Sequence, residues 1–518
     1  MQQTFTIQVS PAEAAHPESI LDYLAAASGQ SRQAITGFHI LKKSIDARGR
    51  QIRINLSLRA FINEPFVERP HQVFQFPDVR NAQHQVIIVG AGPCGIFAAL
   101  QLIELGIRPV ILERGKDVRS RRRDLAAMNK QGIVNPESNY CFGEGGAGTY
   151  SDGKLYTRST KRGNIDRILQ LFVQFGADER ILYEAHPHIG TNKLPHIMVA
   201  MREQILQSGG LFLFEEKMTG FELVNNQVKA VLTASSNRFE GDAVILATGH
   251  SARDIFELLH RQQILIEAKP FALGVRIEHP QELIDRIQYH CPTRGEFLPP
   301  ASYSLVQQVE NRGVFSFCMC PGGIIAPAAT APGELVVNGW SPSKRNNPYA
   351  NSGMVVSIEE KDWQRFKGPL GAMEFQRQVE QRAFAAGGGQ LVGPALRMTD
   401  FVQKRISTDL PDCSYLPGIK SAPLWEVLPD FVFKSLAGGF QAFGKKMKGY
   451  YTRDAVVVAT ESRTSSPVRI PRDPELLNHP QIGNLYPAGE GAGYAGGIVS
   501  AAMDGERIAR VLAAIYQQ

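Results

Sequence analysis

Residues 86–95 read VIIVGAGPCG, the most informative stretch of the chain for its fold. The apolar run at 86–89 predicts a buried strand, and the three glycines after it follow the G-x-G-x-x-G spacing. Glycine lets a backbone approach a pyrophosphate closely, and a helix N-terminus behind the turn supplies N–H groups. The stretch therefore predicts a nucleotide-binding turn made of Gly90, Gly92, Pro93, Cys94 and Gly95.

The residues after this turn complete a βαβ unit. The segment 94–106 predicts an amphipathic helix that ends at a glycine, and RPVILE at 108–113 predicts the second strand. Glu113 lies 18 positions past Gly95, where an acidic side chain binds ribose hydroxyls. Glu113 also disfavours a 2′-phosphate, because two negative charges repel. Arg114 is placed either to stack on adenine or to reduce that repulsion.

The first turn alone leaves NAD(P) and FAD open as the dinucleotide. FAD is too long for one βαβ unit, and two distant segments look like further strand–turn pieces: VILATGH at 244–250, with Thr248 and Gly249, and NLYPAGEGAGYAGGIVSAAMDG at 484–505. No second G-x-G-x-x-G follows a predicted strand; GGGQLVG at 387–393 lacks both the strand and a ribose-binding acid. We therefore expect resident FAD, and NAD(P)H only as a transient electron donor.

These motifs together resemble the glutathione-reductase-type FAD-binding superfamily, and within it a largely uncharacterised family of bacterial FAD-dependent dehydrogenases. The resemblance covers most of the chain and includes KKSIDARG, FGEGGAGTYSDGKLYTR, HPHIGTN, PFALGVRIEHP, FSFCMCPGG and ESRTSSPVRI. It implies that Gly489 and Glu490 lie along the ribityl chain and pyrophosphate, although the superfamily usually has Asp where Glu490 stands. It also implies that Gly496, Gly497 and Ile498 bring a helix N-terminus to the flavin pyrimidine ring. Lys217 and Met218 match the place where a backbone segment contacts adenine.

The glycine-rich stretch FGEGGAGTYSDGK at 142–154 matches, by the same resemblance, a loop that crosses the pyrophosphate near the flavin. Its glycines, Gly143, Gly145, Gly146 and Gly148, allow close backbone approach. Thr149 and Ser151 can donate to phosphate, and Lys154 can balance its charge. An ordinary surface loop is the alternative, since glycine clusters are common in loops.

The sequence does not single out a catalytic acid or base, and the candidates each have a structural alternative. Cys318 and Cys320 are either a redox thiol pair or small buried residues on a core strand, where both would point to one face. Arg276 and His279 are candidates for a substrate pocket, and the alternative for His279 is a surface strand end before a proline.

Three polar segments allow further interpretations. ESRTSSPVRI at 461–470, which contains Arg463, either binds an anion or forms a solvated turn. RGKDVRSRRRD at 114–124 predicts a solvated helical face, and the alternative is a basic surface that steers nucleic acid or NADPH. His186, His188 and His196 lack the neighbouring carboxylates and cysteines of a zinc site, so we expect no metal.

The order of motifs predicts an α/β fold: a Rossmann-like FAD-binding domain with a parallel sheet discontinuous in sequence, an inserted mixed α+β substrate domain, and a small N-terminal βαββ module. The expected boundaries are 1–80 for the module and linker, 84–150, 196–268 and 453–518 for three parts of the FAD-binding domain, 151–195 for a connecting segment, and 269–452 for the substrate domain.

The bulk composition limits the class of protein. The 518 residues carry a net charge of +6, which permits anionic ligands without demanding nucleic acid. Six cysteines without a regular framework predict a reducing, cytoplasmic compartment. No apolar run approaches the length of about 18 residues that a membrane span needs, so we expect no membrane association.

We therefore expect an FAD-dependent oxidoreductase, a dehydrogenase or reductase, that transfers hydride through flavin N5 to or from a small anionic metabolite. An RNA-modifying flavoenzyme is the alternative suggested by the basic residues Lys42, Lys43, Arg48, Arg50 and Arg53, although nucleic acid is not the expected partner. A flavin-binding protein without turnover is a third. The substrate, the electron partner and the oligomeric state stay open.

Overall fold

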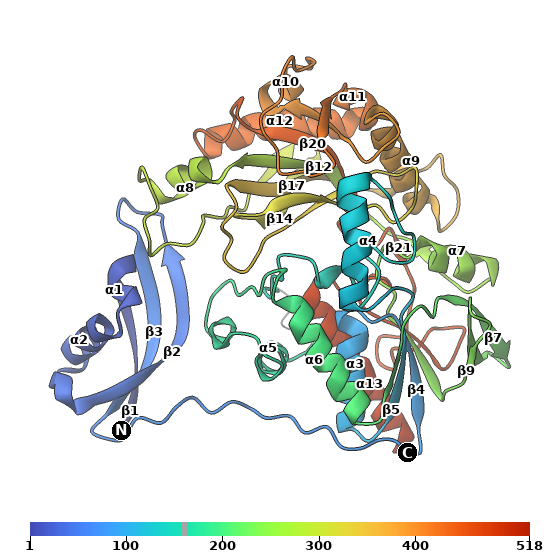
Figure 1. The fold of residues 1–518 in the computed structure, drawn as a ribbon, viewed down its shortest axis with the longest axis horizontal. Coiled ribbons are helices and arrows are strands. Elements are labelled where there is room, and N and C mark those ends of the chain that lie inside the picture. Colours follow the sequence, from blue (N-terminus) through green and yellow to red (C-terminus); the bar gives the residue numbers. More distant parts are fainter. Residues whose placement is uncertain (158–162, 518) are drawn as a thin grey trace.

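The predicted first strand lies at the centre of a parallel sheet. The computed structural model describes residues 1–157 and 163–517, and in it five strands lie in the order β22-β10-β4-β5-β6 (Figure 1). Every neighbouring pair in this sheet is parallel. The strands are β4 Gln85–Val89, β5 Arg108–Leu112, β6 Leu211–Leu213, β10 Ala243–Leu246 and β22 Leu485–Pro487. The chain is thus a mixed α/β protein whose parallel sheet collects strands from distant parts of the sequence.

The two faces of this sheet are covered by different elements, because side chains alternate along each strand. Ile88 packs into a cluster with the helices α3 Pro93–Glu104, α5 Ile165–Gln174, α6 Leu194–Gln207 and α13 Ile498–Tyr516. Ile87 packs on the other side, with the helix α7 Arg253–Arg261 and the small antiparallel sheet β7 Met218–Val224, β8 Gln227–Thr233 and β9 Arg238–Phe239.

Two glycines let α3 pack tightly against its neighbours. A Cβ atom on Gly95 would lie 2.1 Å from the Gly90 carbonyl oxygen, so α3 sits directly on the preceding turn. A Cβ atom on Gly505, in α13, would lie 2.1 Å from the carbonyl oxygen of Cys94. The first and last helices of the nucleotide-binding region are therefore in backbone contact.

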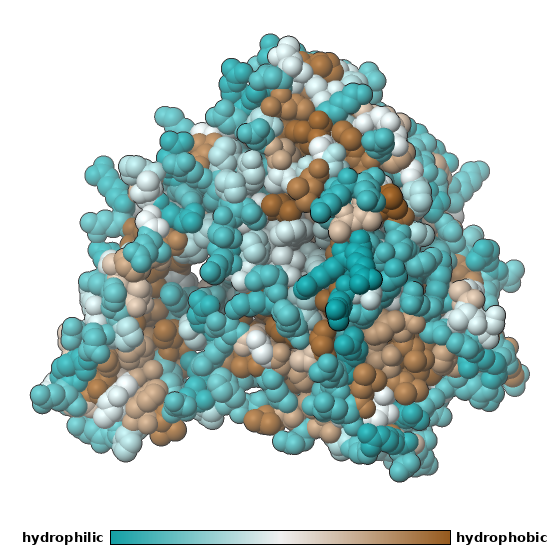
Figure 2. Space-filling model, in the orientation of Figure 1, coloured by the Kyte–Doolittle hydropathy of each residue, from teal (hydrophilic) through white to brown (hydrophobic). Residues whose placement is uncertain are grey.

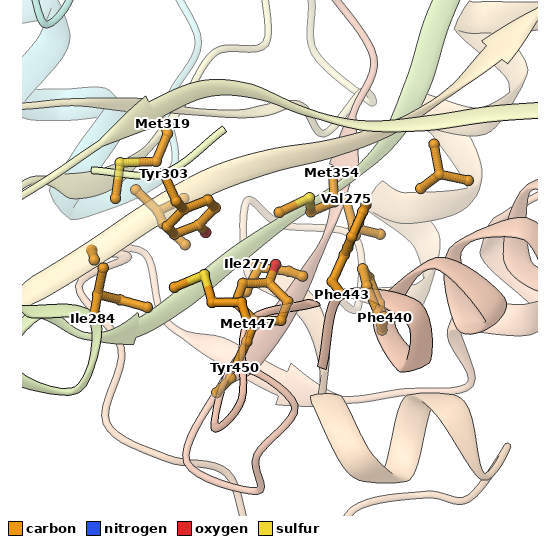
Figure 3. Packing of buried hydrophobic residues seen from close by; sticks show 14 of the residues in the cluster. Val275, Ile277, Ile284, Tyr303, Met319, Met354, Phe440, Phe443, Met447 and Tyr450 are labelled. Carbon is orange, nitrogen blue, oxygen red and sulfur yellow. The ribbon is translucent and has the colours of Figure 1, made fainter. Parts of the chain in front are cut away.

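A second sheet of seven strands lies above the first in Figure 1, in the order β13-β14-β17-β12-β20-β18-β19. Val275, Ile277 and Met354 of this sheet pack against Phe440 and Phe443 of the helix α12 Asp430–Lys446 (Figure 3). The strands are β12 Phe271–Pro280, β13 Val306–Val309, β14 Arg312–Cys320, β17 Tyr349–Ile358, β18 Gly393–Arg397, β19 Ile419–Ser421 and β20 Val456–Glu461. The other elements here are α8 Gln281–Tyr289, α9 Gly371–Ala386, α10 Met398–Val402, α11 Leu424–Val427, and the hairpin β15 Ile324–Pro327 with β16 Val337–Trp340.

One expected boundary differs from the structure. The residues from 453 onward were expected in the nucleotide-binding region, but β20 pairs with β12 and β18 in the seven-stranded sheet. The chain returns to the first sheet only later, through the short pair β11 Glu267–Ala268 with β21 Val468–Arg469 and then β22. An apolar strand such as VVVATE carries no local sign of which sheet it joins, because that choice is made by long-range pairing.

The N-terminal residues form the expected βαββ module, at the left of Figure 1. Its sheet has the order β1-β3-β2, with β1 Gln2–Val9, β2 Ile35–Asp46 and β3 Arg53–Ile62, and its helices are α1 Pro11–Ala15 and α2 Pro17–Ser28. Lys43 donates its backbone N–H to Tyr183, which ties the module to the rest of the chain.

The remaining helix, α4 Val118–Gln131, lies across the front of the molecule, and Figure 2 shows strongly hydrophilic residues there. Among the described residues, none of the helices combines the length and apolar character required to cross a bilayer.

The contact between α3 and α13 can be tested by Gly505→Ala. Alanine in a helix is favoured over glycine by about 1 kcal/mol, but the added methyl group would meet a backbone oxygen, and such overpacking costs roughly 1–3 kcal/mol. We expect a lower midpoint of thermal unfolding than for wild type. Gly49→Ala is the control, because Gly49 lies in an exposed turn with its nearest atom 3.8 Å from the new Cβ. A higher unfolding midpoint for Gly505→Ala would contradict the tight contact.

Candidate functional site

A cavity of about 370 Å³ opens at the carboxyl ends of β4, β10 and β22. This edge of an open parallel sheet is where α/β proteins bind ligands, and the volume lies within the usual range for ligand pockets. The loop at 140–154 forms one wall, and β14 of the seven-stranded sheet together with the hairpin β15–β16 forms the far end. The cavity is therefore shared between the two sheets.

Most of the residues predicted to bind the cofactor line this cavity. They are Gly90, Gly92, Pro93, Cys94, Glu113, Arg114, Gly146, Gly148, Ser151, Lys154, Met218, Thr248, Gly249, Gly489, Glu490, Gly496, Gly497 and Ile498. Gly95, Gly145, Thr149 and Lys217 were also predicted, and they do not line it. Gly95 serves the packing of α3, and Lys217 turns away to bond Glu137 at 2.5 Å.

Several glycines in the cavity wall have empty space beside their backbone, which an extended anionic ligand would need. Cβ atoms added to Gly92, Gly496 or Gly497 would have no heavy atom within 4 Å. Gly92 and Gly497 are the N-caps of α3 and α13, and neither helix has a side-chain cap. Uncapped helix ends leave N–H groups free for phosphate or another anion. The buried hydroxyl of Thr248, also in the wall, has no partner. These features fit FAD.

Glu113 has a larger structural role than the sequence predicted. Its carboxylate accepts backbone N–H groups of Ala91, Gly115 and Gly143, each at 2.9 Å. A carboxylate has about four acceptor positions. One acceptor position is thus left unused, while the others fix the nucleotide turn and the start of the 142–154 loop. Arg114 lies 4.5 Å above the Phe142 ring and pairs with Asp254.

The glycine-rich loop is held by a buried arginine that sequence analysis placed on a solvated helical face. Arg121 of α4 is fully buried and donates to the carbonyl oxygens of Asn139, Glu144 and Gly146 at 2.8–2.9 Å. Only the spacing within RSRRRD could have pointed to it, because position 121 lies on the buried stripe of the helix with Leu125. The basic segment is therefore only partly solvent-facing.

The hydroxyls of the same loop, which were predicted to donate to phosphate, donate to backbone oxygens of the loop in this structure. Thr149 is buried and donates to the Glu144 carbonyl oxygen at 2.8 Å. Ser151 donates to the Gly148 carbonyl oxygen at 2.7 Å, although it lines the cavity. These hydroxyls shape the loop, and the backbone and Lys154 face the ligand space.

The predicted anion-binding segment 461–470 is instead part of a closed ion cluster. The guanidinium of Arg463 donates to Glu334, Glu380 and Thr330. Arg253 of α7 bonds the same two carboxylates, so two cations neutralise two anions in a buried site. The hydroxyls of Thr464 and Ser466 donate to backbone oxygens. Arg463 borders the cavity, but its charge is already balanced.

The two candidates on β12 lie outside the cavity lining. His279 is buried, its Nε2 is 2.9 Å from the Tyr450 carbonyl oxygen, and burial lowers its pKa to about 4. The imidazole is therefore neutral at physiological pH and belongs to the core, so the pocket role considered for it is wrong. Arg276 is also buried and pairs with Glu461 at 2.9 Å, behind the cavity wall.

Cys318 and Cys320 both line the far end of the cavity, but not as a regular strand would place them. The pairing of β14 with β17 shifts register between Phe317 and Cys320, and Cys318 has a left-handed φ of 45°. This β-bulge leaves Cys318 exposed while Cys320 is buried, so the expected common face is broken. Neither alternative from the sequence describes this arrangement fully.

Several residues of the cavity lining belong to no sequence motif from which they could have been predicted. His250 directly follows the predicted Thr248-Gly249 turn and lies 3.5 Å from the Glu490 carboxylate. Asn338 and Trp340 reach the far end from β16. Asp152 pairs with Arg345 at 2.7 Å, and only its place in the SDGK segment could have suggested it. Within the described residues, no group of three or more His, Cys, Asp or Glu side chains could hold a metal ion.

Comparison with known proteins gives matches along most of the chain. A family model described as an FAD binding domain matches residues 83–131, one described as "FAD-dependent protein, C-terminal domain-like" matches 270–464, and one for a domain of unknown function matches 1–61. A protein of Clostridium beijerinckii, described as uncharacterized, is 40% identical over 499 residues, which cover 92% of each chain.

Solved structures give weaker likenesses. The crystal structure of CtdE in complex with FAD is 12% identical, with a TM-score of 0.32, over 83% of this chain and 84% of that chain. The 2,6-dihydroxypyridine-3-hydroxylase from Arthrobacter nicotinovorans is 11% identical, with a TM-score of 0.38, over 84% of each. Scores this low establish neither a shared fold nor a shared reaction.

Replacing Arg121 by methionine tests the support of the 142–154 loop. The change leaves three carbonyl oxygens without their donor, two of them in buried hydrogen bonds, so the loop loses its fixed path. We expect FAD to bind the apoprotein at least about tenfold more weakly, which is about 1.4 kcal/mol, by fluorescence titration. The control is Arg123→Met on the exposed side of α4. Equal affinities for the two variants would contradict the role given to Arg121.

Proposed function

The chain belongs to the same family as the Clostridium beijerinckii protein and carries an FAD-binding domain, and from this premise we propose that it is a flavoenzyme of the oxidoreductase class. The observation that most directly supports this proposal is that two uncapped helix ends, far apart in sequence, open into one cavity between the sheets. Bound FAD would supply hydride transfer at its N5 atom, while the protein holds the cofactor and positions the substrate.

The residues present suggest how the cofactor would be held. The open backbone at Gly92 and the end of α3 would take the diphosphate, and the remaining acceptor position of Glu113 would take a ribose hydroxyl. Gly496 and Gly497, at the start of α13, would meet the flavin ring, where the helix end favours negative charge on the reduced form. We place the family within the glutathione-reductase-type superfamily on the basis of these motifs.

The far end of the cavity supports a small anionic substrate. Lys154 lies 3.7 Å from Asp152, but Asp152 pairs more closely with Arg345, so two cations share one carboxylate. Burial alone would lower the pKa of Lys154, yet the neighbouring Cys320 and Asp152 raise it overall, so the ammonium is charged at neutral pH. The excess positive charge would attract a carboxylate or similar group. NAD(P)H, if it is the donor, would have to enter the same cavity.

Gly92→Val tests the proposed diphosphate site without disturbing the fold. The Cβ atom of the new side chain would have no heavy atom within 4 Å, and the extended backbone angles at Gly92 (φ −78°, ψ −178°) suit valine, so the apoprotein should unfold at the wild-type temperature. The same side chain would occupy the ligand's position, and we expect the purified variant to be colourless. A variant that still binds one FAD per chain would contradict the site, and a wild-type protein that takes up no flavin on reconstitution would end the proposal.

Lys154→Met tests the anionic substrate. Anaerobic reduction of the flavin should first be followed spectrally across a panel of anionic metabolites and NAD(P)H. For a reductant with an anionic group, we expect the half-saturating concentration to rise at least about tenfold in the variant, with partial recovery in Lys154→Arg. Unchanged saturation would contradict the role of Lys154. Flavin that stays oxidised with every donor would instead favour a binding protein without turnover.

A further inference from the structure

The bulge on β14 brings two sulfur atoms to the substrate end of the cavity. A bulge interrupts the hydrogen-bonding ladder, and such features are frequent next to active sites because they re-aim side chains. Here the left-handed φ of Cys318, uncommon outside glycine, turns that residue into the open space. Its neighbour Met319 is buried in the core of the seven-stranded sheet instead.

Two cations contact the buried sulfur. The Cys320 Sγ atom lies 3.5 Å from Nη2 of Arg276 and 3.8 Å from Nζ of Lys154. Protein thiols react as nucleophiles when arginine or lysine lies beside them, because the thiolate is the reacting form. The two thiols therefore have different surroundings: Cys320 is buried beside two cations, and Cys318 is exposed at the end of the cavity.

The spacing permits a bond between them. The Cα atoms of residues i and i+2 are at most about 7 Å apart, and disulfides join Cα atoms roughly 4.4–6.8 Å apart. The Cys320 thiol also donates to the backbone carbonyl oxygen of Cys318 at 3.2 Å, so the Cys320 side chain lies against the backbone of residue 318.

We propose that Cys318 and Cys320 are a redox-active dithiol that exchanges an electron pair with the flavin. In the oxidising direction both S–H bonds break, an S–S bond forms between Cys318 and Cys320, and two electrons and two protons reduce oxidised FAD to FADH2. The reverse step restores the two thiols. The substrate class at this end of the cavity is then a small thiol or disulfide, reached by exchange at the exposed Cys318. This inference rests on FAD being the resident cofactor.

The test counts electrons and thiols in the holoprotein. After mild oxidation and removal of the oxidant, anaerobic titration with dithionite should consume four electrons per FAD in wild type and two in Cys318→Ser or Cys320→Ser. Cys291→Ser, which removes a half-buried cysteine outside the cavity lining, should still consume four. Alkylation and mass spectrometry should find residues 318 and 320 blocked before reduction and labelled after it.

The outcomes separate this inference from the proposed function. Two electrons per FAD in wild type, with both cysteines labelled before reduction, would show inert core thiols and overturn the dithiol while leaving an FAD enzyme intact. A wild-type protein with no flavin would overturn both.

Discussion

The close backbone contact between α3 and α13 is the constraint on which the rest of the site depends. Gly95 and Gly505 leave no room for a side chain at this contact, since Cβ atoms there would lie 2.1 Å from carbonyl oxygens. The contact sets the first glycine turn beside the C-terminal one, where a Cβ atom added to Gly489 would lie only 3.0 Å from the Cβ atom of Cys94. Without it, the two helix ends would not share one cavity.

Most charged side chains near the cavity are hydrogen-bonded or ion-paired within the protein and are not left for a ligand. Glu113 and Arg121 bind backbone groups of the loops they border, and Arg463 is balanced in a four-charge cluster with Arg253. Buried charges of this kind are expensive unless paired or fully hydrogen-bonded. The cavity is therefore rigidly framed, and its unbalanced charge lies near Lys154, at the end away from the nucleotide turn.

Local patterns were enough to predict the strands and helices that border the nucleotide turn, because hydrophobic periodicity and glycine spacing determine them within a few residues. The helix α13 and the N-terminal βαββ order could be predicted in the same way. What sequence could not supply depends on long-range packing. The membership of β20 in the second sheet, the burial of Arg121 and the bulge beside Cys318 arise from partners tens to hundreds of residues away. A segment rich in hydrogen-bond donors, such as ESRTSSPVRI, has the same kind of sequence whether its donors face a ligand or the rest of the protein.

Four separate segments are proposed to enclose one FAD molecule. Hydrogen–deuterium exchange of the apoprotein, with and without added FAD, measures this most directly. We expect slower exchange on FAD addition in all four segments, 86–95, 142–154, 244–250 and 484–498, and no change in the module at 1–62. Protection confined to 86–95, with the C-terminal turn exchanging as before, would contradict it.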